Sequence, residues 1–78
     1  MLAAALEHLV KGIVDNPDDV QVVAKTSPRG DVLEVRVHPE DLGRVIGRAG
    51  RTAKALRTLV SALADGRKVR VDVVDTDF

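Results

Sequence analysis

V-I-G-R-A-G-R-T-A-K, residues 45–54, is the stretch on which the fold of this chain depends. Two glycines three positions apart, Gly47 and Gly50, separate two segments that both have helical patterns. Glycine costs a helix about 0.5–1 kcal/mol relative to alanine. Two glycines at one junction therefore predict a sharp turn between helices, and the arginines beside them suggest that this turn could also be a binding site.

The rest of the chain alternates helices and strands in the order α-β-β-α-α-β. Apolar residues at helical spacing predict the helices, and alternation of apolar with polar residues predicts the strands. Proline and glycine mark where these elements end. The predicted elements are a helix at 2–14, strands at 20–25 and 32–38 joined by a hairpin loop at 26–31, a short helix opened by Pro39-Glu40-Asp41 and ended by Gly47, a helix from about Arg51 to Asp65-Gly66, and a strand at 68–74.

Two of these segments have the clearest apolar faces. In the strand at 32–38, the side chains of Leu33, Val35 and Val37 point the same way. In the helix after Gly50, an apolar stripe lies opposite a basic face; the stripe is Ala53, Leu56, Leu59, Val60 and Leu63, and the basic face is Arg51, Lys54 and Arg57. Because each element has one face to bury, we predict an α+β fold with three helices on one face of a three-stranded sheet.

Composition places the chain among small globular proteins of one domain. Of its 78 residues, 45% are hydrophobic and 31% are charged, which is not the composition of a disordered chain. No apolar run approaches the roughly 18 residues of a membrane span, and the N-terminus lacks the cationic start of a signal peptide. The absence of cysteine excludes disulfides and thiol chemistry. We expect a cytoplasmic protein without a membrane partner.

Charge is distributed unevenly, although the net charge is zero. Residues 1–40 carry four basic and seven acidic side chains, and residues 61–78 carry three basic and four acidic ones. Residues 41–60 carry one acidic side chain, Asp41, and five basic ones, namely Arg44, Arg48, Arg51, Lys54 and Arg57. The basic side chains are thus concentrated around the two glycines, which fits either a solvated helix face or an anion-binding site.

The helix–G-x-x-G–helix arrangement gives this basic segment a chemical role. A helix that begins after Gly50 presents unpaired N–H groups and a partial positive charge at its N-terminus. Glycine lets a polymer backbone approach closely, so such a loop could hold the phosphodiester backbone of a nucleic acid, with the bases beside it. Spacing alone equally allows Gly47 to end one helix and Gly50 to tighten an ordinary corner. The candidate binding residues are Arg44, Val45, Ile46, Gly47, Arg48, Ala49, Gly50, Arg51 and Lys54, with Val45, Ile46 and the edge of the strand at 32–38 on the side of the bases.

Other functional classes lack the residues that they need. Arg51-Thr52 stands where a P-loop requires Gly-Lys-Ser/Thr, and the glycines follow a helix instead of the strand of a Rossmann motif. His8 and His38 have no catalytic or metal-binding set around them. We therefore predict no enzyme activity, metal or cofactor. Phe78 is the only aromatic residue, so the chain also lacks the stacking surface of an RRM or OB fold.

The run V-I-G-R-A-G-R-T-A-K-A-L-R resembles the signature of KH domains, in which V-I-G-x-x-G joins two short helices and holds the backbone of about four nucleotides. The helix and strand before the β-α-α-β core resemble the type II, prokaryotic arrangement. D-N-P-D-D-V at 15–20 and R-K-V-R-V-D-V at 67–73 resemble the KhpA family of small bacterial single-KH RNA-binding proteins. The resemblance extends from about Leu6 to Val74.

This resemblance implies one type II KH domain over residues 1–78, with an N-terminal helix and strand at 2–25 and a core with its G-x-x-G loop at 32–74. Its sheet would be mixed, because the two strands that flank the helix pair run parallel in this arrangement. Base contacts would rely on aliphatic side chains and backbone, which implies weak sequence selectivity.

The implied function is binding of single-stranded RNA in the bacterial cytoplasm, as an RNA chaperone or post-transcriptional regulator linked to cell-envelope homeostasis and cell length. The implied partners are RNA, a KH protein of the KhpB (Jag) type and a second copy of the chain. A KH-like module that binds proteins and not RNA is the alternative. Arg29, Arg67 and Lys68 are further cations, for which RNA contact and plain solvation both stay open.

Overall fold

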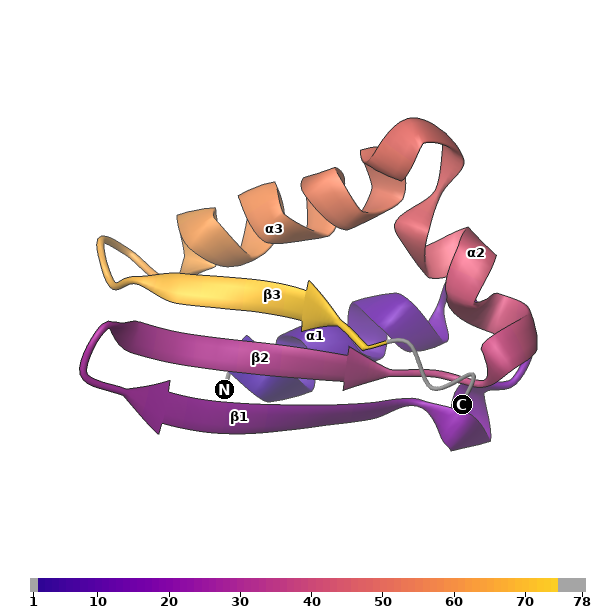
Figure 1. The fold of residues 1–78 in the computed structure, drawn as a ribbon, viewed down its shortest axis with the longest axis horizontal. Helices are drawn as coiled ribbons and strands as arrows, with labels where there is room; N and C mark the ends of the chain where they lie inside the picture. The colour runs from indigo at the N-terminus through magenta and orange to yellow at the C-terminus, as the bar shows by residue number, and fades with distance from the viewer. Residues whose placement is uncertain (1, 75–78) are drawn as a thin grey trace.

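The computed structural model describes residues 2–74, and its elements follow the predicted order (Figure 1). Single turns of 3-10 helix precede β1, α2 and α3, at Pro17–Asp19, Pro39–Asp41 and Arg48–Gly50. The helices are α1 (Leu2–Lys11), α2 (Leu42–Ile46) and α3 (Arg51–Leu63), and the strands are β1 (Gln21–Ser27), β2 (Gly30–Arg36) and β3 (Val69–Val73).

The three strands form one mixed sheet in the order β1-β2-β3. β1 and β2 are antiparallel, and their register runs from Gln21 opposite Arg36 to Ser27 opposite Gly30. β2 and β3 are parallel, from Asp31 opposite Val69 to Val35 opposite Val73. The chain therefore has the type II KH fold, and the predicted parallel pairing of the strands that flank the helix pair is confirmed.

The helices cover one face of this sheet, as predicted. Leu33, Val35 and Val37 are buried together, which confirms the face assigned to the second strand. The helices bury a matching set of apolar side chains against them. This core contains Leu6 and Val10 from α1, Val45 from α2, Leu56 and Val60 from α3, and Val71 from β3.

Two helices differ from the sequence pattern, α1 in its length and α3 in its buried face. α1 ends at Lys11 and not at residue 14, because the Gly12 N–H is shared between the His8 and Leu9 carbonyls and the Ile13 N–H bonds to Val10, three residues back, which tightens the last turn. On α3 the buried positions are Ala53, Leu56 and Val60, while Leu59 and Leu63 are 48% and 56% exposed. The predicted stripe on α3 is thus wrong at these two leucines.

β2 lies at the centre of the sheet, which corrects one feature of the predicted site. Its residues pair with β1 on one side and with β3 on the other. The strand at 32–38 therefore has no free edge to offer to a ligand. The outer edge beside α3 belongs to β3 (Figure 1), where the Arg57 Nε donates a hydrogen bond of 3.2 Å to the Val71 carbonyl oxygen. Any groove beside α3 is thus bounded by β3.

The hairpin between β1 and β2 is tighter than the predicted six-residue loop. Ser27 and Gly30 pair directly, so that Pro28 and Arg29 alone form the turn. Proline suits the first central position of such a turn because its φ is already fixed near the required value. Among residues 2–74, no helix is long and apolar enough to cross a membrane.

Candidate nucleic-acid interface

The connection between α2 and α3 is a compact turn built on unusual backbone angles. Gly47 ends α2 at φ 78° and ψ 171°, and its N–H donates to the Gly43 carbonyl at 2.8 Å. The next three residues form one turn of 3-10 helix, in which Ala49 has φ 56° and Gly50 has φ 75°. Positive φ at three of four successive positions reverses the chain direction sharply, so that α3 begins at once at Arg51.

The two glycines are needed for different reasons. A Cβ at Gly47 would lie 2.7 Å from both the Cβ and the backbone nitrogen of Thr52, and would also meet the Thr52 hydroxyl. Only glycine permits this approach, in a backbone region that other residues almost never occupy. A Cβ at Gly50 would meet nothing within 4 Å. Gly47 therefore closes the turn, whereas the face at Gly50 is open to an approaching molecule.

The start of α3 is positively charged, and no acidic side chain of residues 2–74 neutralises its cations. Among the residues that the structure describes, no side chain caps the helix, and its first turn has no acidic residue. Arg48, Arg51 and Lys54 are exposed, and none of them forms an ion pair with an acid in residues 2–74. Backbone N–H groups at a helix N-terminus attract anions, and the guanidinium groups add donors suited to phosphate.

The structure brings most of the predicted site residues together on the surface and gives two of them, Val45 and Arg44, other contacts. Gly47, Arg48, Ala49, Gly50, Arg51 and Lys54 form the turn and the first turn of α3. Ile46 is 39% exposed beside them. Val45 has no exposed surface, so its side chain belongs to the core and holds α2 in place. Arg44 pairs with Asp15 at 3.2 Å, so its charge is partly compensated.

One structural residue of this region is not evident from sequence patterns. Asp41 is 1% exposed, and its carboxylate accepts hydrogen bonds from the backbone N–H of Asp15 at 3.2 Å and from the backbone and side-chain N–H groups of Asn16, both at 3.0 Å. It thereby ties the α1–β1 connection to the start of α2. In the sequence, Asp41 stands two residues after Pro39 and Asn16 stands directly before Pro17. Both are typical of helix ends, so neither residue indicates the contact between them.

The environment of Asp41 favours its charged form. Burial raises the pKa of this carboxyl, but the hydrogen bonds from Asn16 and Asp15, with a smaller contribution from His38, outweigh burial and lower the pKa below its ordinary value of 3.8. The carboxylate is thus a fixed acceptor that holds the α1–β1 connection against the start of α2. Within the described part of the chain, no three His, Cys, Asp or Glu side chains gather as a metal site.

Comparison with known proteins gives consistent matches along the whole described chain. The family model for the KhpA/KhpB KH domain matches residues 3–74. A Leifsonia xyli protein named "RNA-binding protein KhpA" is 85% identical over 75 residues, covering 96% of this chain and 99% of the relative. Proteins of the same name from Streptomyces coelicolor and Halalkalibacterium halodurans are 73% and 47% identical, covering 99% and 90% of this chain and 96% and 95% of their own.

Proposed function

The chain belongs to the KhpA/KhpB KH-domain family, and from this premise we propose that it binds single-stranded RNA through the turn between α2 and α3. The observation that carries the proposal is the coincidence of an open backbone at Gly50 with Arg48, Arg51 and Lys54, which have no acidic partner within residues 2–74. The names of the relatives support the same ligand.

The chemistry of the turn suits a phosphodiester backbone. A phosphate placed against the open face of Gly50 would meet the N-terminal end of α3, where partial positive charge is available without any side chain in the way. Arg48 and Arg51 would contact neighbouring phosphates, and Lys54 would extend the contact by one helical turn.

Base contacts would be sparse on this surface. Ile46 offers an apolar surface next to the turn, while Val45 supports α2 from within. Because residues 2–74 contain no Phe, Tyr or Trp, they lack the broad rings on which other RNA-binding folds stack bases. We therefore propose weak sequence selectivity.

A charge introduced at Gly50 tests this proposal. Asparagine and aspartate both tolerate the left-handed backbone better than other side chains, and a Cβ has free space at this position. Gly50→Asp places a negative charge where a phosphate would bind, and like charges at a binding surface cost several kcal/mol. We expect Gly50→Asp to weaken binding of a labelled single-stranded RNA by at least about tenfold, and Gly50→Asn to weaken it far less.

Circular dichroism and thermal unfolding establish that both variants fold. Equal RNA affinity of wild type and folded Gly50→Asp, measured by fluorescence anisotropy, would remove the turn from the binding site. Gly47 is unsuitable for this test, because any side chain there would clash with Thr52 and alter the turn itself.

The cellular role that we propose follows from the family resemblance. The chain would act in the bacterial cytoplasm as an RNA chaperone or post-transcriptional regulator in cell-envelope homeostasis and cell-length control, together with a KhpB (Jag)-type KH protein or a second copy of itself. Exposed leucines support such a partner. Leu9 and Leu59 line a hollow of about 400 Å³ between α1 and α3, and exposed apolar surface of this kind favours protein contacts.

The alternative function, a protein-interaction module without RNA binding of its own, rests on these leucines and on the zero net charge. Crosslinking to RNA with the isolated chain, and again after addition of the partner protein, separates the two functions. Crosslinks in the isolated chain support our proposal, whereas crosslinks that appear only on the partner support the alternative.

A further inference from the structure

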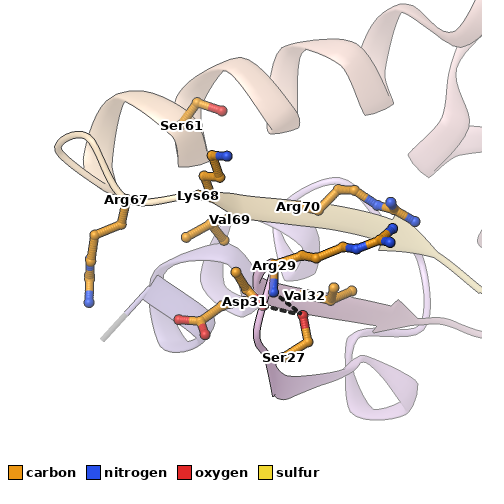
Figure 2. Close-up of a pocket in the computed structure, with 10 residues that line it drawn as sticks. Ser27, Arg29, Asp31, Val32, Ser61, Arg67, Lys68, Val69 and Arg70 are labelled. Carbon is orange, nitrogen blue, oxygen red and sulfur yellow. Dashed lines mark hydrogen bonds between the residues drawn. The ribbon is translucent and has the colours of Figure 1, made fainter.

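A basic hollow lies at the end of the sheet remote from the Gly47–Gly50 turn (Figure 1). The β1–β2 hairpin and the connection from α3 to β3 enclose about 440 Å³, and Figure 2 shows the side chains around it. Four of the residues that line it are basic, namely Arg29, Arg67, Lys68 and Arg70. This concentration of cations in a concave site is separate from the turn described above.

The backbone of this hollow is held by close contacts. The Asp31 N–H donates to the Lys68 carbonyl oxygen at 2.9 Å, and a Cβ at Gly30, which has φ 126°, would lie 2.8 Å from the Lys68 Cβ. The Ser27 hydroxyl donates to the Gly30 carbonyl at 2.8 Å and accepts from the Arg29 N–H at 3.3 Å. The hairpin and the α3–β3 connection are therefore fixed against each other, which places Arg29 and Lys68 around one space.

Most of the positive charge here has no acidic partner. Arg29, Arg67 and Lys68 form no ion pair with any acid in the described chain, whereas Arg70 pairs with Asp72 at 3.4 Å. Asp31 also lines the hollow, but Figure 2 shows its carboxylate pointing away from the guanidinium groups of Arg29 and Arg70. The part of the hollow near Arg29 and Lys68 is thus open to an anion, and Arg70 lies beside it with its charge partly compensated by Asp72.

α3 connects this hollow with the G-x-x-G turn. Arg51 and Lys54 lie at its start, Arg57 reaches the β3 edge at Val71, and Ser61 lines the hollow. Ten residues of helix rise about 15 Å, and a KH turn holds about four nucleotides. A strand that leaves the turn along the β3 edge would therefore reach the hollow after a few nucleotides.

We propose that the hollow lined by Arg29, Lys68 and Arg70 is a second phosphate-binding site for the same RNA strand, so that the footprint exceeds the four nucleotides held at the turn. This inference rests on the proposed function. RNA is favoured over an acidic protein segment because the hollow continues the basic face of α3 along one edge of the sheet.

The test compares two double variants of equal net charge on two lengths of RNA. Arg29→Gln with Lys68→Gln removes two cations from the hollow, and Lys11→Gln with Arg36→Gln removes two cations that pair with Glu7 and Glu34 elsewhere. The RNAs are single strands of about five and about twelve nucleotides, chosen to cover the turn alone and the whole track. Affinities are measured from 0.05 to about 0.5 M salt, the range over which phosphate contacts become visible.

We expect the hollow variant to bind the longer RNA on the order of tenfold more weakly at about 0.1 M salt, with a salt slope shallower by about 1.4 for two lost phosphate contacts. The shorter RNA should bind both variants as it binds wild type. Amide signals of Gly30 and Val69 in NMR spectra should shift with the longer RNA and stay in place with the shorter one.

Several results would overturn the inference, and they are distinguishable from failure of the proposed function. If the hollow variant equals the control variant on the longer RNA while wild type binds the shorter RNA, the second site is wrong and the turn remains. If the hollow variant loses affinity for polyglutamate but binds the longer RNA as wild type does, the hollow binds an acidic protein segment and not RNA. Failure of wild type to bind either RNA would overturn both proposals.

Discussion

Single residues account for the shape of the G-x-x-G turn, and not all of them could be identified in advance. The spacing of Gly47 and Gly50 predicts a turn, but it does not tell which glycine is sterically required. That distinction depends on Thr52, whose side chain folds back toward Gly47. Val45 and Ile46 present the same difficulty, because both are apolar and α2 has only five residues, too few for a periodic pattern to separate a buried position from an exposed one.

Asp41 gives a prediction about stability and pH. Because its pKa is lowered in the folded state, the carboxylate stabilises the fold above the ordinary value of 3.8, and this contribution is lost as the pH falls through the lowered folded value. We expect Asp41→Asn to unfold at lower urea concentration than wild type at pH 7, and the difference to narrow below about pH 4. Glu40→Gln, at an exposed neighbouring position, is the control. A difference that persists unchanged to pH 2.5 would contradict this assignment.

At the scale of elements, the order and type of the α-helices and strands in residues 2–74 follow from the sequence, whereas the single 3-10 turns and the contacts between elements do not. The alternation in 32–38 predicts a strand with one buried face, but it cannot show that this strand is central and that β3 supplies the free edge. The periodicity of α3 likewise predicts an apolar side but not its width. Only the positions of α1 and the sheet decide that Leu56 is buried while Leu59 is exposed.

These two leucines of α3 give a matched pair of substitutions. Leu56 is 3% exposed within the core, and Leu59 is 48% exposed on the same helix. Leu56→Ala removes buried methyl groups and leaves a cavity, so we expect it to lower the free energy of unfolding by about 2–5 kcal/mol. Leu59→Ala should change it by no more than about 0.5 kcal/mol. Urea unfolding measures both, and a larger effect at Leu59 than at Leu56 would contradict the packing of α3.

The whole molecule combines a net charge of zero with a strongly local distribution of cations. The sequence already shows the basic segment at 41–60, because charges can be counted along the chain. It does not show that the separate turns at Arg29 and at Arg67-Lys68 meet at one end of the sheet, since the parallel pairing of β2 with β3 produces that meeting. Compensation by acids is equally invisible in sequence, as the pairing of Arg44 with Asp15 shows.

Salt dependence tests this local distribution as a property of the whole molecule. A neutral protein attracts RNA only weakly at long range, so its affinity should depend on the few phosphates that it touches. With Arg48, Arg51 and Lys54 as the contacts, log affinity against log salt should have a slope near −2 for an RNA of about five nucleotides, because each phosphate contributes about −0.7 in single strands. For about twelve nucleotides, two further contacts at the basic hollow should steepen the slope to about −3.5. A slope near zero for the shorter RNA would mean that these three cations do not neutralise phosphates. A slope several times steeper than about −2 would require a wider footprint or a second copy of the chain on the same RNA.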